Sequence, residues 1–154
     1  MMRHPGLVPL VVLFATLGLS ACEDENAGGG SKTSAYGGTE SHNAGQACMG
    51  CHSRGTDNEL WWTVAGTVYR LDGTTTNPGC TVILAAGPGP DSGVVATLPV
   101  DARGNFYTTM PVAFGNGLIV SVRGTSAEVR TMGAAVTQGD CNSCHTVGQR
   151  ISAN

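Results

Sequence analysis

Residues 78–85 read Pro-Gly-Cys-Thr-Val-Ile-Leu-Ala, a turn signal followed by an unbroken run of strand formers. Pro and Gly mark the turn, and the β-branched Thr, Val and Ile that follow favour a strand over 80–85. The same unit, a short apolar run between Gly-rich breakers, recurs along the middle of the chain at intervals of about 8–12 residues. This spacing is typical of an all-β sandwich.

Outward from this run we expect short strands and no long helix, because no stretch keeps an apolar period of 3.6 residues. The expected strands are 62–69, 80–85, 94–100, 105–109, 118–122 and 127–132. Turn-forming residues separate them, as in Gly-Pro-Gly-Pro over 87–90. We therefore predict a mainly β fold, a small antiparallel β-sandwich over 61–133, with helical turns only at the motifs described next.

The pattern Cys-x-x-Cys-His occurs twice, over 48–52 before the predicted sandwich and over 141–145 after it. It is the attachment pattern of a c-type haem, because two sulfurs one helical turn apart can form thioethers with one porphyrin. The attachment cysteines are Cys48, Cys51, Cys141 and Cys144. His52 and His145 then supply the proximal iron ligands. We predict two haem c groups, held by flanking haem-binding segments over 42–60 and 134–154.

Three runs stand out in the middle of the chain: Val-Ala-Gly-Thr-Val-Tyr over 64–69, Pro-Gly-Cys-Thr-Val-Ile-Leu over 78–84 and Asp-Ala-Arg-Gly-Asn-Phe-Tyr over 101–107. With these runs the middle of the chain resembles the carboxypeptidase-regulatory-like family of Ig-like, transthyretin-like sandwich domains. The whole chain also looks like exported cytochromes with one haem motif on each side of such a domain. The resemblance implies a scaffold for haems and not a peptidase. Cys80 departs from it, since a small residue such as alanine is usual there, and we expect a buried side chain.

Residues 1–21 have the layout of a bacterial lipoprotein signal peptide. Arg3 precedes an apolar run over 7–19, which is too short to span a bilayer comfortably. Small residues then lead into Cys22, the expected site of lipidation. We expect a mature chain anchored to the bacterial cell envelope, on the outer membrane, facing the periplasm or the surface, through a flexible Gly/Ser-rich tether over 22–41. In the alternative, an ordinary signal peptide is cut near Ala21 and Cys22 is incidental.

The sixth ligand of each iron has to come from a short list. His42 is a candidate distal ligand of one haem, and Met132 is the better methionine candidate for the other. The alternatives are a solvated loop histidine and an ordinary core methionine. Trp61 or Trp62 is a candidate to pack on the first porphyrin, or else to cover the edge of the sandwich core.

Composition and motifs together favour an electron carrier over an enzyme. The net charge is −3 and no basic cluster is present, so nucleic-acid binding has no electrostatic support. We expect redox protein partners, with self-association or a multi-haem assembly as an open variant. No acid–base pair stands out, but a haem enzyme with one open iron site is an alternative. Another is a structural zinc site of the four motif cysteines, which leaves both motif histidines unexplained.

Overall fold

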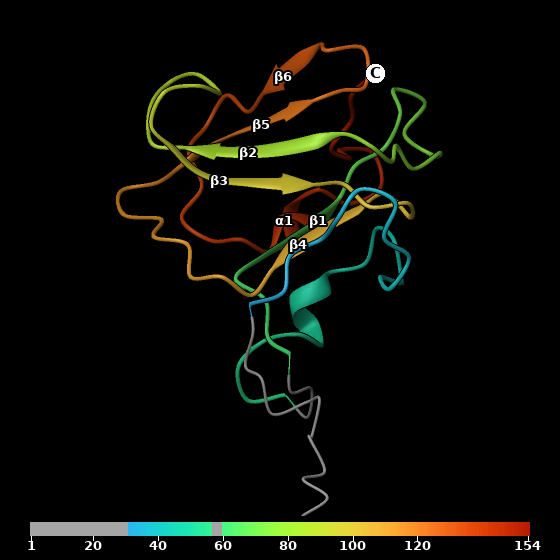
Figure 1. Ribbon diagram of the computed structural model, residues 1–154, viewed down its shortest axis with the longest axis vertical. Helices are drawn as coiled ribbons and strands as arrows, with labels where there is room; N and C mark the ends of the chain where they lie inside the picture. Colours follow the sequence, from blue (N-terminus) through green and yellow to red (C-terminus); the bar gives the residue numbers. More distant parts are fainter. Residues whose placement is uncertain (1–30, 57–59) are drawn as a thin grey trace, which may run out of the picture.

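The computed structural model describes residues 31–56 and 60–154 (Figure 1). Their strands are β1 Val64–Thr67, β2 Thr81–Ala85, β3 Val94–Pro99, β4 Asn105–Thr108, β5 Ile119–Arg123 and β6 Val129–Thr131. The helical elements of this part are the 3-10 turn η1 Cys48–Gly50 and the short helix α1 Cys141–Cys144. The mainly β prediction is confirmed, with a strand overlapping each predicted run and helical turns at both motifs. The predicted signal peptide and Cys22 lie outside the described residues.

The strands form two antiparallel sheets. One sheet pairs β1 with β4, and the other has the order β3-β2-β5-β6. In the larger sheet, Val82 stands opposite Leu98 on one side and Val122 on the other. Directly opposed residues share a face, so this row of apolar side chains points to one side of the sheet. Two sheets around one apolar layer are compatible with the predicted β-sandwich.

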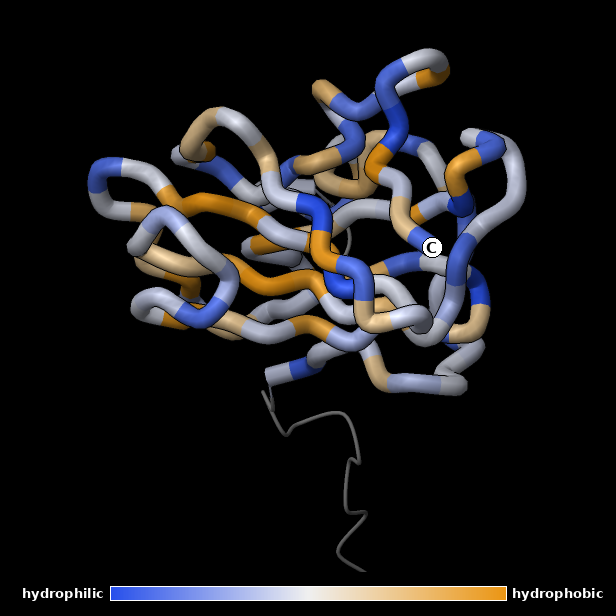
Figure 2. Tube along the Cα trace, turned by 90° about the horizontal axis from the view of Figure 1, so that it is seen from above, coloured by the Kyte–Doolittle hydropathy of each residue, from blue (hydrophilic) through white to orange (hydrophobic). Residues whose placement is uncertain are grey.

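The core lies between the two sheets, where alternate residues of facing strands meet. The buried cluster consists of Val64, Val68, Cys80, Val82, Leu84, Leu98, Val100, Phe106, Leu118, Val120, Val122 and Ala153. In the view of Figure 2, the most hydrophobic segments run along the strands, and hydrophilic segments lie mostly in the loops. Cys80 is 0 % exposed and comes directly before β2, so the prediction of a buried side chain is confirmed.

The C-terminal segment belongs to the same compact unit, although 134–154 was predicted to flank the sandwich. The Ala65 N–H donates to the Gly139 carbonyl at 2.9 Å, and Tyr69 forms a parallel bridge with Ser152. Gly66 of β1 makes this packing possible, because a Cβ there would lie 2.9 Å from the Cβ of Cys141. The domain boundary expected at 133/134 therefore runs through one packed core.

In the described part of the tether expected over 22–41, residues 32–34 pair with the smaller sheet and do not form a flexible linker. The backbone of Ser34 donates to the Tyr107 carbonyl at 2.9 Å, and Thr109 donates to the Lys32 carbonyl at 2.8 Å. Ser34 is buried and its hydroxyl donates to the Pro99 carbonyl at 2.6 Å. Residues 32–34 thus extend the smaller sheet along β4, because backbone pairing needs no large apolar side chains.

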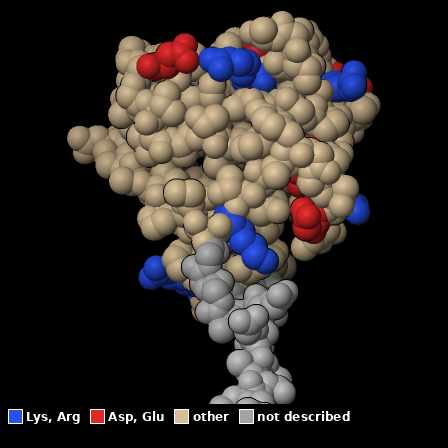
Figure 3. All heavy atoms as spheres, viewed as in Figure 1, with Lys and Arg blue, Asp and Glu red and all other residues tan. Residues whose placement is uncertain are grey.

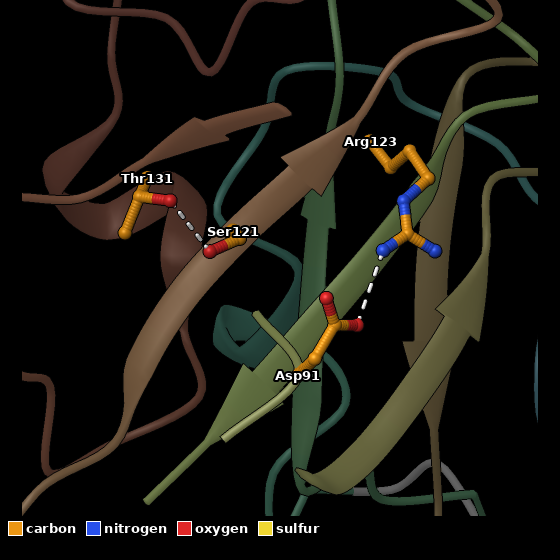
Figure 4. A network of polar contacts seen from close by, with 4 residues as sticks. All are labelled: Asp91, Ser121, Arg123 and Thr131. Atoms are coloured by element: carbon orange, nitrogen blue, oxygen red, sulfur yellow. Dashed lines mark hydrogen bonds and ion pairs between the residues drawn. The ribbon is translucent and has the colours of Figure 1, made fainter. Parts of the chain in front are cut away.

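Polar contacts on the larger sheet join β5 to β6 and to the loop between β2 and β3 (Figure 4). The Ser121 and Thr131 hydroxyls lie 2.8 Å apart across β5 and β6. Arg123 pairs with Asp91 at 3.3 Å, an exposed ion pair that contributes little to stability. The face drawn in Figure 3 carries scattered charges in no continuous patch. Within residues 31–56 and 60–154, none of the helices has the length and apolar character needed to cross a membrane.

Candidate functional site

The first motif forms the short turn η1, which contacts β1. The backbone N–H groups of Cys51 and His52 both donate to the Cys48 carbonyl, at 3.2 and 3.0 Å. One turn therefore holds the two thiols and the imidazole of the motif together. Cys48 is half-buried and Cys51 is exposed. This spacing is what thioether attachment to one porphyrin requires.

Two contacts determine the tautomer and the orientation of the His52 ring. Its Nδ1 lies 3.0 Å from the Leu60 carbonyl oxygen. A carbonyl can only accept, so Nδ1 carries the proton and Nε2 keeps its lone pair. The ring also stacks on Trp62 with centroids 4.0 Å apart, and Trp62 stacks on Tyr107 at 4.7 Å. The ring is thus held in an orientation that leaves Nε2 available for a metal.

His42 lies beside the first motif. The centroids of the His42 and His52 rings are 5.8 Å apart, with a tilt of 46°. A small pocket joins them, and its lining residues are His42, Asn43, Gln46, Ala47, Cys48, Cys51, His52 and Trp62. The His42 side chain is exposed. The structure therefore brings the predicted distal histidine to the first motif.

The second motif forms α1, which packs on β1 (Figure 1). The His145 N–H donates to the Cys141 carbonyl at 3.0 Å, so this turn also gathers its thiols and imidazole. His145 Nδ1 lies 2.7 Å from the Gln149 carbonyl oxygen. The same tautomer follows as for His52, with a proton on Nδ1 and a lone pair on Nε2. The two motifs share this arrangement although the accepting carbonyls come from unrelated sequences.

The second motif opens onto an apolar cavity of about 240 Å³. The cavity is bounded by the larger sheet and by the segment after β6, and its lining includes Val82, Val120, Val122, Arg130, Met132, Val136, Asp140, Cys141, Cys144, His145, Arg150 and Ile151. All three functional side chains of the second motif therefore line one partly open apolar pocket. Arg130 and Arg150 add positive charge to its walls.

Strand register explains why Met132 reaches this cavity. Arg130 stands opposite Val122, and the Met132 N–H donates to the Val120 carbonyl at 2.9 Å. Val120 and Val122 face the core, and residues beside them on the neighbouring strand face the same way. Met132 thus packs on the core cluster and also lines the cavity that holds His145. The structure brings the predicted distal methionine to the second motif.

The two cysteines of each motif differ in burial. Desolvation raises the pKa of Cys48 to about 11 and that of Cys141 to about 12, and the charge of Asp140 adds to both shifts. Cys51 and Cys144 are exposed. Burial also raises the pKa of Asp140 itself, opposed by a hydrogen bond from the Met49 backbone. The first thiol of each motif is therefore held in its neutral form near pH 7.

The two motifs lie side by side. Asn142, inside the second motif, donates to the Gln46 carbonyl at 2.8 Å, and its Nδ2 lies 3.9 Å from the Sγ of Cys48. Asn142 and Cys48 are 94 positions apart in the sequence. Two segments that the sequence placed on opposite sides of a domain thus meet at β1.

The four motif cysteines do not converge on one point. In the described part of the chain, no group of three or more His, Cys, Asp or Glu side chains is arranged to hold a metal ion. The predicted ligands instead fall into two separate sets, one around His52 and one around His145. Trp61 lies under the Arg54 guanidinium at 4.2 Å, while Trp62 supports His52.

Sequence reasoning missed four contributors to these sites. Asn142 occupies a position of the motif where any residue is allowed, so the motif gave no reason to predict a role for it. Asp140 and Arg150 reach the cavity only because the C-terminal segment folds back onto β1. Side chains alternate between the two faces of a strand. Because Met132 was predicted to lie at the site, Arg130, two residues before it in the predicted strand 127–132, could have been predicted to lie there too.

No family model, curated protein or solved structure matches the chain. The resemblance to carboxypeptidase-regulatory-like domains therefore stays a prediction about family.

Proposed function

We propose that this chain is a two-haem c-type cytochrome that passes single electrons between redox partners outside the cytoplasm. The observation that carries the proposal is the shared state of His52 and His145, each with Nδ1–H bonded to a backbone carbonyl and Nε2 left to bind. Such a carbonyl behind the ring is the usual support of a metal-bound imidazole. Two thiols, one helical turn apart and directly before each histidine, complete the donor set of a covalent haem.

The residues around the second motif fit this cofactor. Cys141 and Cys144 would hold the porphyrin by thioethers, and His145 would bind the iron. The apolar walls of the cavity suit a porphyrin face, and Arg130 and Arg150 suit its carboxylates. A bound haem supplies a one-electron iron couple, whose potential depends on the axial ligands and on burial.

The first site fits the same group with different surroundings. Cys48 and Cys51 would form the thioethers, His52 would be the proximal ligand and His42 the distal one. The pocket there is smaller, so the protein would cover less of this haem than of the second. Two histidines on one iron favour a lower potential than histidine with methionine. We therefore propose two haems of unequal potential on one β-sandwich.

A haem enzyme with one open iron site is the second candidate function. It is favoured by the cavity at the second motif, which leaves room beside His145, and by the thioether of Met132 being a weak ligand. Carbon monoxide binding to the reduced protein separates the two functions. Rapid binding at one haem supports an open site, and no binding at either haem supports the carrier.

We further propose that the carrier is lipid-anchored in the bacterial cell envelope through Cys22. The sequence supports this location by its signal-peptide layout and lipobox-like junction. Expressed with its own signal, the protein should appear in the membrane fraction, whereas Cys22→Ser should release it in soluble, haem-loaded form. Equal distribution of both proteins would overturn the anchor and leave the haem proposal standing.

Absorption spectroscopy tests the haem proposal against the zinc alternative. The chain should be made in a bacterial host that has haem-attachment machinery, and then extracted with acidified acetone. A covalent haem keeps its Soret band with the protein through this step. A colourless protein that holds zinc would contradict the proposal.

A further inference from the structure

Asn142 is a buried amide that belongs to the second motif but binds the loop before the first. Its side chain is 2 % exposed. Its Oδ1 accepts from the Thr67 N–H at 3.1 Å, and its Nδ2 donates to the Gln46 carbonyl at 2.8 Å and to the Thr67 hydroxyl at 3.0 Å. A flipped amide would face the Thr67 N–H with a donor and the Gln46 carbonyl with an acceptor. The orientation is therefore fixed by its partners.

Thr67, on β1, passes this link on to the loop that carries His42. Its hydroxyl accepts from the Gly45 N–H at 2.9 Å and donates to Asn105 Oδ1 at 2.7 Å. Asn105 Nδ2 in turn donates to the Ser41 hydroxyl at 3.0 Å and the His42 carbonyl at 3.2 Å. We name residues 41–46 the ligand loop. Buried hydrogen bonds thus tie both ends of the ligand loop to the second motif.

We propose that Asn142 is a positioning residue that couples the two haem sites, by fixing the ligand loop and its candidate distal ligand His42 against the second motif. This inference rests on the proposed function. A primary amide is the side chain that offers one acceptor and two donors in this geometry. Aspartate has the same shape but lacks both donors. A change inside the second motif therefore acts on the iron site of the first.

Coupling of this kind has a consequence for electron transfer. The ligand loop leads directly into Cys48, whose Sγ lies 3.9 Å from Asn142 Nδ2. Asn142 itself follows the attachment cysteine Cys141. One fully hydrogen-bonded amide therefore sets the spacing of the two attachment turns, and it would also set the spacing of the haems that these turns would hold.

The test compares Asn142→Asp and Thr67→Val with the matched control Ser143→Ala. Ser143 lies between the same two cysteines but is exposed, and its hydroxyl donates to the Asp140 carbonyl. We expect both link variants to shift the potential and the near-infrared ligand band of the first haem, several-fold more than the control does. Pulsed electron paramagnetic resonance on the ferric protein should show a broadened haem–haem distance in the link variants. A first haem that behaves in both variants as it does in the control would overturn the proposal.

A second readout works on the purified full chain with or without haem. The Gly45 amide loses its acceptor in Thr67→Val, and the ligand loop loses an anchor in Asn142→Asp. We expect hydrogen exchange of the ligand loop to speed up about tenfold or more in both link variants, and to stay unchanged in Ser143→Ala. Unchanged exchange in the link variants would overturn the link. Absence of haem with faster exchange would instead overturn the proposed function and leave the link intact.

Discussion

The two copies of one five-residue motif sit in different surroundings. The first lies against a small pocket with a second histidine and an aromatic stack, while the second lies at a larger apolar pocket beside a methionine. The turn, the paired thiols and the hydrogen bond from Nδ1 to a backbone carbonyl are common to both. In the proposed cytochrome, the pattern would specify attachment and proximal ligation, and the neighbouring strands and loops would specify burial and the distal ligand. Two haems of one chemical type would then differ in potential.

The largest expected effect comes from removing one attachment pair at a time. Cys48→Ala/Cys51→Ala and Cys141→Ala/Cys144→Ala should each leave one covalent haem. Emptying the second site should also destabilise the domain more, because the pocket there exposes more apolar surface to water than the pocket at the first site does. The difference should be about 1–3 kcal/mol. Denaturant unfolding of both variants measures it, and equal losses of stability would contradict the contrast between the two sites.

Removing each candidate distal ligand should change one haem and spare the other. His42→Ala should alter the near-infrared magnetic circular dichroism band of the first haem, because its iron loses a nitrogen ligand. Met132→Ala should do the same at the second haem and leave the first unchanged. Unchanged bands in both variants would remove the ligand assignments while leaving the two attachment sites in place.

Thiol alkylation of haem-free protein sharpens the comparison within each motif. Cys48, with a pKa of about 11, and Cys141, with a pKa of about 12, form little thiolate at pH 8. Iodoacetamide should therefore modify the exposed Cys51 and Cys144 first. Relative to a thiol of pKa 9, the lower thiolate fraction alone slows Cys48 about 100-fold and Cys141 about 1,000-fold. Peptide mass spectrometry over time measures the order in which the cysteines are modified. Labelling of all four cysteines at the same rate would contradict this difference in burial.

The smallest expected effect concerns Asp140, which lies between the two motifs. Its folded-state pKa is raised by burial, so its contribution to stability is full below the unfolded pKa and is lost as the pH rises through the folded pKa. Because asparagine does not ionise, Asp140→Asn removes this loss of stability with rising pH. The variant should match the parent near pH 3 and exceed it at pH 7 by less than about 1 kcal/mol, since water screens a half-exposed carboxyl. Thermal unfolding at both pH values measures it, and a variant less stable at pH 7 would contradict the sign.

The sequence alone predicted the features that depend on residues close together in the chain. β-branched runs between Gly-rich turns gave the strand positions, and the motif spacing gave the turns that hold His52 and His145. Contacts between segments far apart in the chain could not be predicted in this way. Lys32 and Ser34 join β4 through backbone bonds, which polar, Gly-rich composition conceals. Asn142 contacts the first motif only because the chain returns to β1 after the sandwich is built.

The central claim is two covalent haems on one chain, and intact mass with the reduced visible spectrum tests it most directly. The protein should be made with its own signal in a host that has haem-attachment machinery. We predict a mass equal to the mature chain with the lipid proposed at Cys22 plus two haems, and a reduced spectrum typical of c-type haem. A mass equal to the chain alone, with no haem absorption, would contradict the claim.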